Sequence, residues 1–134
     1  MTPEMIDELV REARAARERA LAPYSEFKVG AALRTRGGRI VRGCNIENSS
    51  YGLTVCAERV ALLAGLADGE YEWEAVAVVT QSETPSPPCG PCRQLMWEYC
   101  GDIDVILSNL NGSVERMKLS ELFPRPFEFK REKR

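Results

Sequence analysis

One short apolar run, Ala75–Thr80, most constrains how this chain can fold. It reads Ala-Val-Ala-Val-Val-Thr and lacks the alternation of a strand that faces water on one side. Its length and valine content predict a β-strand that is buried on both faces. Such a strand needs other elements above and below its sheet, so the chain is expected to form layers.

The remaining segments alternate between helical and extended patterns. A capping Thr2 with Pro3 and Glu4 starts a helical periodicity that runs to about Leu21, where Pro23 follows. Diglycine Gly37-Gly38 and Asn111-Gly112 each separate two apolar-rich runs, which is typical of β-hairpins. The further predicted helices are 56–67, 89–99 and a short turn from Ser120, and the predicted strands are 27–35, 39–46, 75–80, 105–108 and 114–118. We therefore expect one domain over residues 1–134, a three-layer α/β/α sandwich with a mixed five-stranded sheet.

Histidine is absent and cysteine occurs five times. Catalysis by a Ser-His-Asp or Cys-His arrangement is thereby excluded, and a metal would have to bind thiolates, carboxylates or backbone oxygens. With 18 basic and 20 acidic residues the formal net charge is −2, which argues against nucleic-acid binding, and the basic Lys130–Arg134 is expected to be a solvated tail. No segment has the apolar length of a membrane span or a signal peptide, so we expect a soluble, cytoplasmic protein with reduced thiols.

Three of the cysteines begin predicted helices. Cys56 opens one helix, and Cys89 and Cys92 open another, where unpaired backbone N–H groups favour thiolates. Three protein ligands leave one tetrahedral position open, which is the pattern of catalytic zinc. Glu58, in the first turn after Cys56, is placed to accept the proton of an activated water and to deliver it elsewhere.

The pattern Cys-Ala-Glu followed by Pro-Cys-x-x-Cys matches the signature of zinc deaminases, in which activated water attacks C4 of cytosine and a glutamate acts as acid and base. Nearly the whole chain resembles the small homotetrameric cytidine deaminases. The matching segments are residues 23–25, 27–33, 45–48, 51–59, 89–94 and 121–124, with Phe127. The resemblance implies hydrolysis of cytidine, and of 2′-deoxycytidine, to the uracil nucleoside and ammonia in pyrimidine salvage, with one zinc ion per chain.

The resemblance also implies roles for individual residues. Cys56, Cys89 and Cys92 would bind zinc, and Glu58 would move protons. For the substrate, Asn45 and Glu47 would hold the ribose 3′-hydroxyl, Phe27 would pack on the base, the Ala57 N–H would bind the base carbonyl, and Tyr51 and Phe127 would reach a neighbouring subunit's pocket.

A zinc ion with three thiolates carries a net charge of −1, which weakens its pull on bound water. A cation that donates to the sulfurs offsets this charge, so Arg59 and Arg93, which stand beside the ligands, are expected to support the metal site. The family usually has serine before Pro-Cys, where this chain has Pro87. A backbone carbonyl at that place still accepts a hydrogen bond from the substrate amine, whereas a hydroxyl contact would be lost.

Three alternatives stay open. Cys-Gly-Pro-Cys at 89–92 is also a dithiol redox motif, although an oxidoreductase leaves Glu58 unexplained. A fourth thiolate from Cys44 or Cys100 would close a non-catalytic zinc site, but both are expected to be small buried hydrophobic residues. A deaminase of another aminopyrimidine nucleoside, of the blasticidin type, shares the second cysteine motif.

Overall fold

The computed structural model describes residues 1–128, and the predicted solvated tail Lys130–Arg134 lies outside this range. Its strands form one five-stranded sheet in the order β2-β1-β3-β4-β5. The strands are β1 Gly30–Thr35, β2 Ile40–Cys44, β3 Trp73–Thr80, β4 Asp104–Asn109 and β5 Val114–Lys118. Because β3 and β4 run parallel and the other neighbours run antiparallel, the sheet is mixed, as the sequence predicted.

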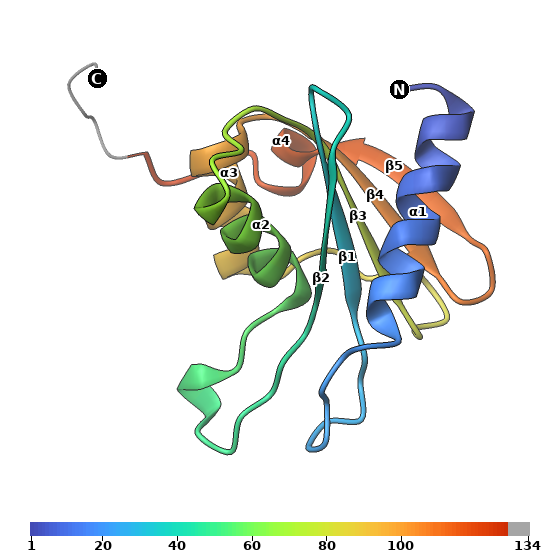
Figure 1. Ribbon diagram of the computed structural model, residues 1–134, viewed down its shortest axis with the longest axis vertical. Coiled ribbons are helices and arrows are strands. Elements are labelled where there is room, and N and C mark those ends of the chain that lie inside the picture. Colours follow the sequence, from blue (N-terminus) through green and yellow to red (C-terminus); the bar gives the residue numbers. More distant parts are fainter. Residues whose placement is uncertain (129–134) are drawn as a thin grey trace.

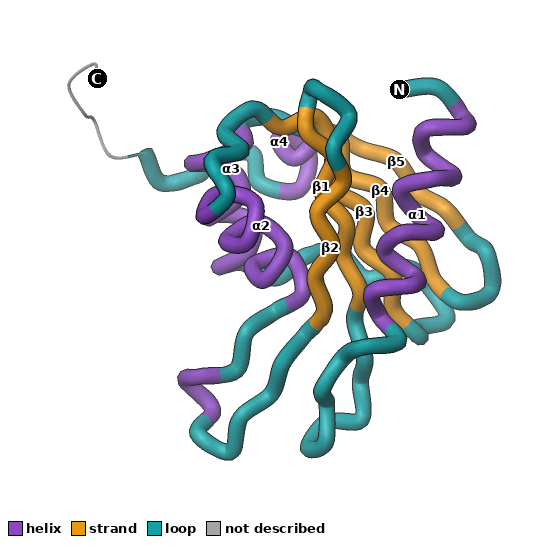
Figure 2. Tube along the Cα trace, in the orientation of Figure 1, coloured by secondary structure: helices purple, strands orange, loops and turns teal. Residues whose placement is uncertain are grey.

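Helices cover both faces of this sheet (Figures 1 and 2). Helix α1, Pro3–Arg17, packs on one face, and α2, Ala57–Ala67, and α3, Gly90–Cys100, lie on the other. A short helix α4, Leu119–Leu122, follows β5, and a single 3-10 turn, Tyr51–Leu53, precedes α2. The predicted three-layer α/β/α architecture is therefore confirmed.

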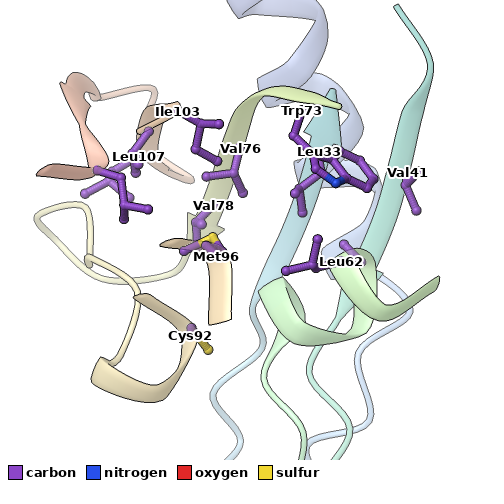
Figure 3. Close-up of a cluster of buried hydrophobic side chains, with 13 residues drawn as sticks. Leu33, Val41, Leu62, Trp73, Val76, Val78, Cys92, Met96, Ile103 and Leu107 are labelled. Carbon is purple, nitrogen blue, oxygen red and sulfur yellow. The ribbon is translucent and has the colours of Figure 1, made fainter. Parts of the chain in front are cut away.

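Strand β3 is buried on both faces, as its apolar run predicted. Val76 and Val78 point into the larger core, which they share with Leu33, Leu62 and other residues beneath α2 and α3 (Figure 3). Ala75, Ala77 and Val79 point into the smaller core beneath α1. The carboxyl ends of β3 and β4, the parallel pair, lie at one edge of the sheet, and the loop after β3 leads directly into α3.

Two glycines let helices approach the sheet closely. A Cβ on Gly43 would lie 2.4 Å from the Ala57 carbonyl oxygen, and one on Gly30 would lie 2.0 Å from the Ala13 carbonyl oxygen. Both distances are shorter than any packed contact, so only glycine fits at these positions. The close approach at Gly43 fixes the first turn of α2 against strand β2.

The N-terminal helix is shorter than its periodicity suggested. Helix α1 ends at Arg17, and Leu21 instead pairs with the β2 extension: its N–H donates to the Asn45 carbonyl at 3.0 Å and its carbonyl accepts from the Glu47 N–H at 2.8 Å. The expected strand from Phe27 begins only at Gly30, since residues 27–29 contact side chains of other segments. No helix among residues 1–128 is long and apolar enough to cross a lipid bilayer.

Candidate active site and metal centre

The three predicted ligands lie together at the starts of α2 and α3. Cys56 is the N-cap of α2, Cys89 is the N-cap of α3, and Cys92 lies in the first turn of α3. The Sγ atoms of Cys56 and Cys89 are 3.7 Å apart, those of Cys89 and Cys92 are 3.2 Å apart, and all three lie within 4.8 Å of one another. Thiolates on one tetrahedral zinc ion, each about 2.3 Å from the metal, are about 3.8 Å apart, so this donor set fits zinc.

The surroundings shift the pKa values of two of these thiols in opposite directions. A hydrogen bond with Cys92, and further ones with Arg59 and Cys89, lower the pKa of Cys56 to about 5. The same contact with Cys56, together with burial, raises the pKa of Cys92. One thiolate is thus already stabilised at the start of α2, where a metal ligand must be deprotonated.

Glu58 lies in the first turn of α2 beside the sulfurs. It is only 4% exposed, and this burial raises the pKa of its carboxyl group to about 7. A carboxyl group with a pKa near neutrality gives up and takes back a proton readily at physiological pH. The position and the titration of Glu58 therefore suit a proton carrier.

A cavity of about 200 Å³ opens in front of the metal ligands. Half of the predicted site residues lie on its wall, together with Pro87, the residue that stands where the family usually has serine. These lining residues are Phe27, Asn45, Cys56, Ala57, Glu58, Pro87 and Cys89. A single cavity thus contains an apolar ring, an amide, a buried carboxyl group and two of the three sulfurs.

The two residues assigned to ribose binding hold a neighbouring turn in this structure. Asn45 accepts from the Val29 N–H and donates to the Phe27 carbonyl, both at 2.8 Å, and so places Phe27 at the cavity. Glu47 is not on the cavity wall. Its carboxylate accepts from the backbone N–H groups of Tyr24 and Ser25 and from the Ser25 hydroxyl, and these hydrogen bonds lower its pKa.

Two predicted aromatic contacts lie away from the cavity of their own chain. Tyr51 is 91% exposed in the 3-10 turn, and Phe127 is 65% exposed near the end of the described chain. Neither side chain lines the cavity. Their exposure leaves both aromatic rings available to another molecule.

The two arginines beside the ligands differ in what they contact. Arg59 donates from Nη2 to the Cys56 Sγ at 3.6 Å and to the Thr54 carbonyl at 3.3 Å, as expected of a cation that supports the sulfurs. Arg93 donates from Nε to the Pro88 carbonyl at 2.7 Å and from Nη1 to the Leu122 carbonyl at 2.8 Å. Arg93 therefore supports backbone segments, and within residues 1–128 it has no hydrogen bond to a sulfur.

Sequence reasoning missed a chain of hydroxyl groups on the cavity wall. Thr80 and Ser86 line the cavity, and Ser82 joins them through Oγ contacts of 3.1 and 2.8 Å. The only sequence signal was the concentration of hydroxyl residues in the loop before Cys89.

The two remaining cysteines do not join the sulfur cluster in the described part of the chain. Cys44 and Cys100 are both half-buried, and Cys100 packs against the larger core. Burial raises the pKa of both thiols, that of Cys100 to about 12. The structure thus offers no fourth thiolate within residues 1–128 to close the metal site.

Comparisons with known proteins agree with this geometry. The family described as "Cytidine and deoxycytidylate deaminase zinc-binding region" matches residues 3–108. The chain is 51% identical over 120 residues to a cytidine deaminase from Halalkalibacterium halodurans, which covers 89% of this chain and 91% of that protein. A crystal structure of cytidine deaminase from Burkholderia pseudomallei superposes with a TM-score of 0.88 at 48% identity, over 95% of this chain and all of that one. A blasticidin-S deaminase from Bacillus cereus is more distant, with 30% identity over 119 residues, which span 81% of this chain and 84% of that protein.

Proposed function

This chain belongs to the cytidine and deoxycytidylate deaminase family, and from that membership we infer that it is a zinc-dependent hydrolase that converts cytidine and water to uridine and ammonia. The observation that carries the inference is the meeting of three cysteine sulfurs and the buried Glu58 at one cavity. A dithiol oxidoreductase would use Cys89 and Cys92 but has no use for Cys56 or Glu58.

Each group in the cavity has a task in this reaction. Zinc, when bound by the three sulfurs, supplies Lewis-acid chemistry that makes water nucleophilic near neutral pH. The Glu58 carboxylate takes up one proton from the attacking water and donates it to N3 of the cytosine ring. It then takes up a second proton, from the hydroxyl group now on C4, and donates it to the amine that leaves C4. Arg59 donates to the Cys56 sulfur and so lowers the excess negative charge of the ligand set.

Four other predicted site residues, of which Glu47 lies outside the cavity wall, are proposed to bind the nucleoside. The Phe27 ring packs on the base, and the Ala57 N–H donates to the base carbonyl at the start of α2, where backbone N–H groups are unpaired. Asn45 and Glu47 bind the ribose 3′-hydroxyl. None of these contacts requires a 2′-hydroxyl, so we expect cytidine and 2′-deoxycytidine both to be substrates.

Ammonia release from cytidine, measured together with zinc content, tests the proposed function. We expect about one zinc ion per chain and loss of the cytidine absorbance as uridine forms. If the zinc-loaded protein releases ammonia from blasticidin S and not from cytidine, the proposed substrate is wrong. If the protein binds no metal and reduces disulfides, the proposed function is wrong.

Glu47→Gln tests the ribose contact. Loss of a charged acceptor should raise the KM for cytidine about tenfold and leave the zinc content unchanged. Because Glu47 also holds the turn at Ser25, Ser25→Ala serves as the matched control: it weakens the turn but keeps the carboxylate. An unchanged KM in Glu47→Gln, or an equal rise of KM in Ser25→Ala, would show that Glu47 does not bind the ribose.

The proposal also covers the oligomeric state and the cellular location of the protein. Tyr51 and Phe127 are exposed aromatic residues outside their own cavity, which supports a homotetramer in which each reaches a neighbouring subunit's site. Sedimentation at several protein concentrations measures the assembly. A cytoplasmic role in pyrimidine salvage suits a site of three reduced thiols, because oxidising compartments convert neighbouring thiols to disulfides.

A further inference from the structure

Arg93 joins two segments that are far apart in the sequence. Its guanidinium donates to the carbonyl of Pro88, immediately before ligand Cys89, and to the carbonyl of Leu122, at the end of α4. Arg93 itself follows ligand Cys92 directly. One half-buried side chain thus connects the entry of α3 with the segment that leads to Phe127.

The loop before Cys89 is held by side-chain hydrogen bonds at Glu83 and Ser86, but its last two residues are prolines. Pro85, Pro87 and Pro88 lack backbone N–H groups, so the loop can make few backbone hydrogen bonds. Cys89 is the N-cap of α3 but makes no side-chain capping bond. The carbonyl of Pro88, the residue before Cys89, accepts from Arg93 Nε at 2.7 Å, so Arg93 anchors this loop at its last residue.

Helix α3 also holds residues 122–128, which we call the C-terminal strap. Gln94 makes two hydrogen bonds with the Phe127 backbone, of 2.9 and 3.2 Å, and the Trp97 ring N–H donates to Glu128 at 3.0 Å. Arg93 adds the bond at the other end of the strap, to Leu122. Three side chains from the helix that carries Cys92 thus fix the strap that presents Phe127.

We propose that Arg93 is a positioning residue that couples the zinc-ligand loop to the C-terminal strap. It acts by geometry: its planar guanidinium donates from Nε to one carbonyl and from Nη1 to the other, a fixed spacing of two donors that the compact ammonium of lysine does not reproduce. Arg59, by contrast, acts on a sulfur by charge. The inference rests on the proposed function only for the role of Phe127 in a neighbouring site.

Arg93→Lys tests the coupling because it keeps the charge and removes the fork. In the zinc-loaded variant we expect faster hydrogen–deuterium exchange both at the backbone N–H of residue 93, which donates to the Cys89 carbonyl at 3.0 Å, and in the strap. We also expect zinc loss to a chelator about 10- to 100-fold faster than in the unaltered protein. Gln94→Ala frees only the strap end at Phe127, so exchange should rise in the strap alone, with zinc loss unchanged. Arg116→Lys, on the exposed face of β5, should change neither quantity.

The outcomes separate cleanly. Unchanged exchange in either segment of Arg93→Lys, or full retention of zinc, overturns the coupling. If Arg93→Lys does not load zinc, hydrogen–deuterium exchange of the strap is compared between the metal-free variant and the metal-free unaltered protein. Faster exchange in the variant alone supports the coupling, and equal exchange overturns it. These readouts need no substrate, so a protein that releases no ammonia from cytidine would end the proposed function and leave the coupling to be judged on its own.

Discussion

The helices α2 and α3 begin in the same way and are held in different ways. Each starts after an extended cysteine N-cap, Cys56 with φ −71° and ψ 153° and Cys89 with φ −68° and ψ 167°. The first turn of α2 then supplies the buried Glu58 and an arginine directed at a sulfur, whereas that of α3 supplies a second sulfur and an arginine directed at backbone. In the proposed reaction α2 therefore supplies the proton carrier and the charge balance, and α3 supplies two of the three zinc ligands.

Removal of a ligand from α3 is expected to have the largest effect. Cys92→Ala takes away one of three sulfurs and should reduce zinc from about one ion per chain to almost none, with loss of activity. Cys100→Ala, on the same helix but outside the cluster, should keep its zinc. Metal analysis of both purified variants measures the difference, and full zinc in Cys92→Ala would contradict the division of labour between the helices.

The corresponding change in α2 should separate chemistry from metal binding. Glu58→Gln keeps the size of the side chain but removes the proton carrier, so kcat should fall by about 10²- to 10⁴-fold while zinc stays bound. Steady-state kinetics and metal analysis on one preparation measure both quantities. Glu115→Gln on exposed β5 is the control. Near-normal turnover in Glu58→Gln would mean that the proton passes through another group.

The sequence predicted the parts of this site that depend on local pattern. Cys56, Cys89 and Cys92 stand at helix starts, and helix starts are marked by loops, prolines and capping positions along the chain. The buried strand β3 was equally clear, because a continuous apolar run needs no knowledge of its neighbours. The three-layer fold followed from the order of such elements.

Contacts between distant segments were not predictable in the same way. The helix α1 periodicity continues to Leu21, yet the helix ends at Arg17 because Leu21 pairs with Asn45 and Glu47. Arg93 stands beside a ligand in sequence, but its bonds go to Pro88 and Leu122, which only the folded chain brings near. Sequence position alone does not show where a long side chain ends.

In the metal-free protein, the alkylation rates of the thiols compare the two helix starts directly, and the expected effect is smaller. With a pKa of about 5, Cys56 stays a thiolate from pH 8 down to about 5 and gains its proton below that. Its alkylation by iodoacetamide should therefore vary little between pH 6 and 8 and fall below pH 5. Cys92 and Cys100, whose pKa values are raised, should react at least about tenfold more slowly in that range.

Peptide mapping by mass spectrometry assigns each alkylation rate to its cysteine. The sign of the pH dependence is the decisive feature: a lowered pKa gives a flat rate above about pH 5, whereas an ordinary thiol gives a rate that rises about tenfold per pH unit up to its pKa. A steep rise for Cys56 between pH 6 and 8 would mean that the start of α2 does not stabilise a thiolate.

The smallest expected effect concerns how each helix start is packed. A Cβ at Gly43 would collide with the backbone of α2 at the Ala57 oxygen and the Ala61 nitrogen, at 2.4 and 2.5 Å, whereas a Cβ at Gly90 in α3 would meet nothing within 4 Å. Gly43→Ala must push α2 away from β2, and overpacking of this kind costs about 1–3 kcal/mol of unfolding free energy. Gly90→Ala should change it by less than about 0.5 kcal/mol.

Urea unfolding of the two glycine variants measures these costs, with kcat and zinc content measured in parallel. Because Gly43 contacts the turn that carries Glu58, the loss of stability in Gly43→Ala should come with a lower kcat and little change in bound zinc. Equal stability of the two variants would show that α2 is held against the sheet no more rigidly than α3, and the backbone contact at Gly43 would then not be what positions Glu58.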